Sequence, residues 1–171
     1  MKPSTKNILI FIIVFMSIIL DQVTKKIAYA YLAGSKNISI FHNVFLLQYT
    51  ENTGGFLGMG SAIPENIRFW VFSVSVALFL LILLIYLIFS KSFTIRQTVA
   101  LSAIIGGGIG NLIDRFLNHG RVVDFMNVGI GPVRTGVFNV ADLFITFGAI
   151  FLLWFFMVES RKENRAESKS Q

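Results

Sequence analysis

The sequence predicts a membrane α-helical fold: four transmembrane helices with a small extracytoplasmic β-cradle and an amphipathic loop. Three observations lead to this class. The 171 residues are 54% hydrophobic and include 18 Phe, and the mean hydropathy is +0.71, well above that of a soluble domain. Four apolar runs have the length of about twenty residues that a helix needs to cross a bilayer. One long connection is instead polar and alternates in hydrophobicity, as short strands do.

The first span is expected at about 7–27. Its apolar run, 8–20, is interrupted only by Ser17 and is followed by Asp21 and Gln22. A removable signal peptide is the alternative, because the AYA sequence at 28–30 has the small residues of a cleavage site. Charged and amide residues separate that sequence from the apolar run, whereas a signal peptide would continue without charge. We therefore favour a retained helix whose far end contains Asp21.

The segment 28–66 is the longest connection and is expected to form short strands that end in the glycine turn Gly54-Gly55. The alternating apolar residues at 38–47 support this assignment. Pro64 and Glu65 then begin the second helix, because proline is tolerated in a first helical turn.

The remaining spans are expected at about 67–89, 98–113 and 137–158. The third contains Gly106, Gly107, Gly108 and Gly110, a composition that in a membrane indicates close approach by a neighbouring backbone. A second outer connection covers 114–136, and 159–171 is a charged tail that we expect to be frayed. The spans and connections use most of the chain, so 1–171 is predicted to be a single membrane domain.

Charge near the ends of the spans predicts the orientation. Four spans place both termini on one side, and short segments on that side carry eight of the fifteen cations: Lys2, Lys6, Lys91, Arg96, Arg161, Lys162, Arg165 and Lys169. Positive charge concentrates on the cytoplasmic side of membrane proteins. Both termini are therefore expected in the cytoplasm of a multi-pass protein, with 28–66 and 114–136 outside.

Four aspartates converge at the outer face in this topology. Asp21 ends the first span, Asp114 ends the third, Asp124 lies in the following loop, and Asp142 lies five residues into the fourth span. An acidic residue near the hydrocarbon layer is unfavourable, by about 3 kcal/mol at the centre of a helix. Four of them at one depth therefore favour a functional explanation.

Asp124 and Asp142 are the pair that we expect to carry the chemistry. Two adjacent carboxylates share a proton, so one can activate a water while the other polarises a carbonyl oxygen. Asn139 lies three residues before Asp142, on the same face of that helical turn. Each aspartate could instead be a cap or a structural ion pair. That reading is favoured for Asp114, whose neighbour Arg115 would pair with other helices, and for Asp21 both readings stay open.

Other chemistries are poorly supported. His42 and His119 are the only histidines and are far apart in the sequence, so no metal site is expected. No serine lies in a nucleophile elbow, and no lysine follows the glycines as in a phosphate loop. The cations are scattered, which argues against a nucleic-acid partner, and the absence of cysteine excludes disulfides. No cofactor is expected.

Five blocks of the chain, in order, resemble bacterial lipoprotein signal peptidase, also called signal peptidase II, a family of aspartyl peptidases. The blocks are 21–25 (DQVTK), 52–54 (NTG), 107–115 (GGIGNLIDR), 122–125 (VVDF) and 138–142 (FNVAD). One departure follows the second block, where the family commonly has small alanines and a phenylalanine and this chain has Gly55-Phe56-Leu57. Substrate clamping at this loop is expected to differ in detail.

The resemblance implies a membrane aspartyl endopeptidase that removes the signal peptide from a prolipoprotein, cutting before a diacylglyceryl-modified cysteine. It implies that Asp124 and Asp142 are the catalytic dyad. It also implies a set of substrate-binding or supporting residues, namely Asp21, Asn52, Asn111, Asp114, Arg115 and Asn139. The implied partners are the lipid-modified prolipoprotein and membrane lipids, and the antibiotic globomycin is the expected inhibitor. We expect a monomer in the bacterial cytoplasmic (inner) membrane, with its active site near the extracytoplasmic face.

Two other classes of function remain as alternatives. A small proton- or cation-coupled transporter also uses intramembrane acids, but it predicts acids spread along the depth of the membrane. A non-enzymatic membrane scaffold would use all the acids in structural pairs. Ion-dependent flux without proteolysis would favour the first, and a cellular role that survives loss of both Asp124 and Asp142 would favour the second.

Overall fold

The computed structural model describes residues 2–55, 60 and 62–170. Its elements, in order, are α1 (Pro3–Leu32), β1 (Ile38–Ile40), β2 (Phe45–Asn52), α2 (Glu65–Phe69), the π-helical η2 (Trp70–Val74), α3 (Ser75–Phe89), α4 (Ile95–Leu117), β3 (Val122–Ile130), β4 (Val133–Arg134) and α5 (Val140–Ser170). Elements α2, η2 and α3 are continuous and form one long helix. Among the described residues, four helices are therefore long and apolar enough to cross a membrane. Together with the sheet, they confirm the predicted fold class.

α4 is the central helix. Its most apolar window is 61% buried, against 17% for each of the other three spans, and α4 contacts α1, α3 and α5. Successive helical residues point about 100° apart, so three consecutive glycines present a bare backbone to three neighbours. A Cβ on Gly107 would lie 2.5 Å from the Ala141 carbonyl of α5, and one on Gly108 would lie 2.6 Å from Leu80 of α3, while Gly106 faces α1. The predicted close approach is confirmed.

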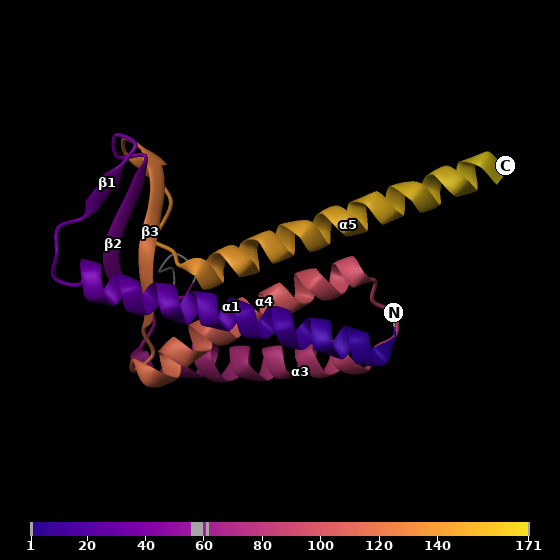
Figure 1. Cartoon of the computed structure of the whole chain (residues 1–171), viewed down its shortest axis with the longest axis horizontal. Helices are drawn as coiled ribbons and strands as arrows, with labels where there is room; N and C mark the ends of the chain where they lie inside the picture. Colours follow the sequence, from indigo (N-terminus) through magenta and orange to yellow (C-terminus); the bar gives the residue numbers. More distant parts are fainter. Residues whose placement is uncertain (1, 56–59, 61, 171) are drawn as a thin grey trace.

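The strands form one antiparallel sheet in the order β1-β2-β3-β4. The pairing of β2 with β3 shifts between Leu47, which is opposite Met126, and Thr50, which is opposite Asp124. One extra residue of β2 is accommodated there as a bulge, which re-aims the side chains that follow it. Figure 1 shows the sheet standing across one end of the helices, with both termini at the other end.

Three helices extend past the predicted spans. α1 covers Pro3–Leu32 instead of 7–27, and the second span begins at Glu65, with Pro64 as its N-cap and not in its first turn. α4 covers Ile95–Leu117 instead of 98–113, so Asp114 and Arg115 lie in a helix and not in the outer connection 114–136. Polar residues can continue these helices because they are paired inside the fold.

α5 differs most from the prediction. It begins at Val140 instead of 137, so Asp142 lies in its first turn, and it continues to Ser170. The expectation of a frayed tail at 159–171 is wrong up to that residue, because the tail is rich in Glu, Lys and Arg, which are strong helix formers. Residues 122–123, just before Asp124, are the start of the nine-residue strand β3. Phe56 and Leu57, where the chain departs from the family that it resembles, lie outside the described residues.

Candidate active site

Two carboxylates from different elements meet at Asn139. Asp124 lies on β3 and is 2% exposed, and Asp142 lies in the first turn of α5. The side-chain amide of Asn139 donates a 2.6 Å hydrogen bond to Oδ1 of Asp124. The backbone N–H of Asn139 donates a 3.0 Å hydrogen bond to Oδ2 of Asp142. The two carboxylates expected to carry the chemistry therefore share one neighbour.

Local sequence explains this arrangement. Oδ1 of Asn139 accepts a 3.0 Å hydrogen bond from the backbone N–H of Asp142, so the two residues form a reciprocal capping box that starts α5. Its spacing from Asp142 had suggested that Asn139 lies within the same helical turn. Asn139 is instead the N-cap that precedes the helix. Phe138, just before it, pairs with Met126 of β3 through a 2.8 Å backbone hydrogen bond. The strand pairing and the cap together hold Asp142 beside Asp124.

Two further asparagines complete the hydrogen bonding of the carboxylates. Asn52, at the end of β2, donates a 2.8 Å hydrogen bond to Oδ2 of Asp124. Its own Oδ1 accepts from the backbone N–H of Gly54 at 2.9 Å, which holds the side chain in place at the turn. Asn111 of α4 donates a 2.9 Å hydrogen bond to Oδ1 of Asp142. Every carboxylate oxygen of the pair therefore accepts a hydrogen bond.

A buried cation lies behind this layer. Lys25 of α1 is 4% exposed, and its Nζ lies 2.8 Å from Asp21, 3.1 Å from Asp114 and 2.9 Å from Oδ1 of Asn111. Asn111 in turn contacts Asp142. Charge at Lys25 is thus connected to the carboxylate pair through a single amide.

The two outer carboxylates of this cluster also bind backbone. Asp21 accepts a 2.9 Å hydrogen bond from the N–H of Ala141 in the first turn of α5, and Asp114 accepts a 2.9 Å hydrogen bond from the N–H of Val123. Each therefore ties one helix to the residue next to Asp142 or Asp124. The structural reading of Asp114 fits this geometry, and Asp21 has an equivalent position.

Sequence reasoning missed Lys25 and Gln22. Both lie among the polar residues at the far end of the first span, but the sequence alone assigned neither of them a role in the site. Gln22 donates a 2.9 Å hydrogen bond to Asp114 and also contacts the Gly110 carbonyl. The available signal was the spacing of Asp21 and Lys25, which lie four residues apart and so share one face of a helix.

Arg115 lies outside the ion-paired cluster around Lys25. The expected ion pairing with other helices holds for Asp114, but among the described residues Arg115 has no ion pair within 4 Å, and its buried Nε has no hydrogen-bond partner. Adjacent helical residues project in different directions, which separates Arg115 from Asp114. Its guanidinium lies within electrostatic range of Asp142 and Asp124.

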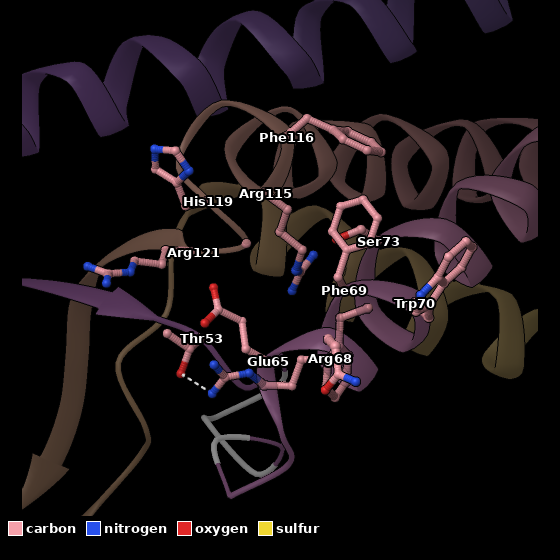
Figure 2. A pocket seen from close by; sticks show the side chains of 13 residues that line it. Thr53, Glu65, Arg68, Phe69, Trp70, Ser73, Arg115, Phe116, His119 and Arg121 are labelled. Carbon is pink, nitrogen blue, oxygen red and sulfur yellow. Dashed lines mark hydrogen bonds between the residues drawn. The ribbon is translucent and has the colours of Figure 1, made fainter.

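Arg115 enters a cleft of about 520 Å³. In Figure 2 it reaches from α4 into the cleft, with Phe69, Trp70 and Phe116 on one side and Arg121 on the other. Phe69 and Phe116 pack edge to face, with ring centroids 6.3 Å apart. The cleft therefore combines an aromatic wall with cationic side chains.

The electrostatic surroundings of Asp124 favour its protonated form. Burial is the main cause that raises the pKa of Asp124 to about 7; the hydrogen bond from Asn52 opposes this rise, and the charge of Asp142 adds to it. At neutral pH the Asp124 carboxyl is thus partly protonated. Among the residues that the structure describes, no group of three His, Asp or Glu side chains could hold a metal ion. The groups that this site offers are the carboxylates, the amides and the Arg115 guanidinium.

Comparison with known proteins adds independent information. Residues 13–158 match the family model described as Signal peptidase (SPase) II. The lipoprotein signal peptidase of Chlorobium phaeobacteroides (strain BS1) is 37% identical over 157 residues, which cover 86% of this chain and 95% of that protein. The lipoprotein signal peptidase of Pelodictyon phaeoclathratiforme (strain DSM 5477 / BU-1) is 37% identical over 160 residues, with coverage of 86% and 89%. A bacterial membrane enzyme solved by the in meso method at 2.3 Å has a TM-score of 0.73 and 26% identity, with 88% of each chain covered.

Proposed function

Because the chain belongs to the signal peptidase II family, we propose that it removes signal peptides from prolipoproteins by cutting before a diacylglyceryl-modified cysteine. Asp124 and Asp142 are the catalytic dyad of this proposal. The observation that carries it is the shared contact of both carboxylates with Asn139, which keeps two acids adjacent at one end of the helices. That end is the outer face of the bacterial cytoplasmic membrane, and both termini are cytoplasmic.

The different surroundings of the two acids suggest their roles. Burial raises the pKa of Asp124 to about 7, so it is the member that carries the shared proton. Asp142 lies at the amino end of α5, where the helix dipole favours a negative charge. Asp142 is therefore the base and Asp124 the acid.

The reaction then follows from these roles. Asp142 takes a proton from a water molecule, whose oxygen bonds to the carbonyl carbon of the residue before the lipid-modified cysteine. Asp124 gives its proton to the carbonyl oxygen, which produces a neutral tetrahedral intermediate. When the C–N bond breaks, the cysteine nitrogen takes the proton from Asp142, and Asp124 recovers a proton as the new carboxyl group forms. Asp124 and Asp142 end as they began.

The cleft beside Arg115 is proposed to receive the substrate. Its aromatic wall, which includes Phe69 and Phe116, suits an apolar signal peptide that arrives from the bilayer. The guanidinium of Arg115, which lines this cleft, binds a backbone carbonyl of that peptide in this proposal. Asn52, Asn111, Asn139, Asp21 and Asp114 support the dyad in this proposal, and the enzyme acts as a monomer.

The test is cleavage of a purified diacylglyceryl prolipoprotein in detergent. Asp124→Asn and Asp142→Asn are each expected to lower kcat by about 1,000-fold or more, because general acid–base catalysis alone contributes about 100- to 10,000-fold and both steps need the pair. Glu159→Gln, a change of an exposed carboxylate on α5 far from the carboxylate pair, is the control and should keep its activity. Globomycin should inhibit the unaltered protein. Substantial turnover by either dyad variant that is still folded would contradict the assignment.

Neither alternative function is favoured by a specific observation. A transporter requires acids along the depth of the membrane, whereas Asp21, Asp114, Asp124 and Asp142 belong to one hydrogen-bonded cluster at the sheet end of the helices. A scaffold does not require two adjacent carboxylates such as Asp124 and Asp142.

A further inference from the structure

The end of the sheet farthest from Asp124 exposes large apolar side chains, here called the apolar tip. Ile130 and Val133 form a cross-strand pair and are 77% and 78% exposed, and Phe41, in the turn between β1 and β2, is 76% exposed. Ile38 and Val44 complete the set, with exposures of 47% and 39%. Contiguous apolar side chains on a surface outside the spanning helices indicate an interaction site.

The turn that presents Phe41 is held in an unfavourable conformation. Phe41, His42 and Asn43 have consecutive φ angles of 52°, 53° and 66°, a left-handed region that residues other than glycine rarely occupy. Ser39 stabilises the turn by accepting a 3.1 Å hydrogen bond from the N–H of Asn43. Arg134 donates a 2.7 Å hydrogen bond to the Asn43 carbonyl and so joins this turn to β4. Strain that the surroundings maintain is typical of functional surface segments.

The direction of the apolar tip is set by the register of β3. Side chains alternate along a strand, so Ile130 lies on the same face as Asp124, six residues away. That face meets the amino end of α5, because Asp124 contacts Asn139, while Phe125 on the other face packs against Ala28 and Leu32 of α1. Val133 is paired with Ile130 and shares its face.

The apolar tip extends past the helices. Figure 1 shows the strands crossing the ends of the helices at one side, with the turns of the sheet projecting beyond α1 and α5. The outward faces of those helices are themselves apolar, as Phe11 and Phe147, 66% and 63% exposed, illustrate. Lipid around such helices would therefore lie beside the projecting apolar tip.

We propose that the apolar tip inserts into the outer surface of the lipid bilayer and anchors the sheet there. The occupant is lipid, since the apolar tip projects beyond helices whose own exposed side chains are apolar. Aromatic and aliphatic residues at an interface bind a membrane through the apolar area that they bury. The inference rests on the placement of the four helices in a membrane and does not depend on the peptidase reaction.

The experiment uses the absence of cysteine from the chain. Single variants Phe41→Cys, Ile130→Cys and Val133→Cys are labelled with an environment-sensitive fluorophore and reconstituted in phosphatidylcholine–phosphatidylglycerol liposomes. Lys36→Cys is the matched control, because Lys36 is exposed in the loop between α1 and β1, which Figure 1 shows on the side of the sheet away from the helices. Phe147→Cys on α5 is the lipid-exposed reference.

The labels at Phe41, Ile130 and Val133 are expected to emit at shorter wavelength than the label at Lys36. They should be quenched several-fold more strongly by spin-labelled lipid, as at Phe147, and less by aqueous iodide. Quenching by iodide equal to that at Lys36 would overturn the proposal. Protection from both iodide and spin-labelled lipid would also overturn it, because a second copy of the chain or another protein would then cover the apolar tip.

Discussion

Asp124 and Asp142 share Asn139 but differ in their titration environment, which predicts a pH dependence. Burial raises the pKa of Asp124 to about 7, above its usual value of 3.8. The acid form that the proposed mechanism needs is therefore present below that pH and lost above it. We expect kcat/KM for prolipoprotein cleavage to fall tenfold per pH unit at high pH, with an apparent pKa of about 7.

A variant tests whether the pKa of Asp124 causes this fall of kcat/KM at high pH. The hydrogen bond from Asn52 lowers the pKa of Asp124, so Asn52→Ala should move the alkaline limb of the cleavage profile to higher pH. Loss of the hydrogen bond should also reduce the maximal rate. A profile of the unaltered protein that stays flat between about pH 6 and about pH 9 would contradict the role of Asp124 as the acid.

Lys25 is the residue whose loss should affect stability most. It neutralises Asp21 and Asp114 in a buried cluster, and removal of one partner leaves uncompensated buried charge. Lys25→Met is expected to lower the free energy of unfolding by about 3–5 kcal/mol, seen as a lower midpoint of thermal unfolding in detergent. Lys26→Met, a change of the exposed neighbour, should have little effect.

A second substitution separates charge from packing at this position. Adding Asp114→Asn to Lys25→Met removes one of the two unpaired carboxylates, so part of the lost stability should return. If the double variant is less stable than the single variant by the full effect of Asp114→Asn alone, Lys25 acts on its own packing and not through its ion pairs.

Among the elements, α4 allows a matched comparison of two glycines. A Cβ at Gly107 would meet the backbone carbonyl of Ala141, which cannot move without shifting α5 and Asp142. A Cβ at Gly108 would meet the ends of the flexible Leu80 side chain, which can repack. Gly107→Ala should therefore lower stability by about 1–3 kcal/mol and reduce cleavage, whereas Gly108→Ala should stay within about 1 kcal/mol.

Thermal unfolding and cleavage assays of both glycine variants measure this difference. The helices that pack against α4 explain why we expect the two variants to differ. α5 carries Asp142 in its first turn, directly after Ala141. Leu80 lies on α3, which carries no member of the carboxylate cluster. Equal loss of cleavage in the two variants would show that helix separation does not control the position of Asp142.

The orientation of the whole molecule can be tested with the same cysteine-free chain. Ser35 lies between α1 and β1 at the sheet end, and Ser92 lies between α3 and α4, near Lys91 and Arg96. Positive charge near Ser92 predicts that this connection is cytoplasmic. A membrane-impermeant maleimide should label Ser35→Cys in intact spheroplasts and Ser92→Cys only after permeabilisation. The reverse pattern would place the sheet and the carboxylate pair in the cytoplasm.

Much of the architecture could be predicted from the sequence because it depends on local composition. Hydropathy over about twenty residues identified each span, and alternation identified strands in 28–66. The direction of the spans alone predicts that Asp21, Asp114, Asp124 and Asp142 lie at one end of the helices. Every one of the predicted site residues except Arg115 has a hydrogen bond or ion pair in one connected cluster.

Only the tertiary structure decided how those residues are held. Lys25 meets Asp114, and Asn139 meets both Asp124 and Asn111, across long separations in sequence. Such contacts are set by helix packing and strand register, which composition does not encode. The sequence determined by itself which segments are apolar and which carry acids, because hydrophobic burial is a property of each segment. The bulge in β2, the cap of α5 and the three-way packing of α4 settled the distances between them, because those depend on the shapes of surfaces that meet only when the chain is folded.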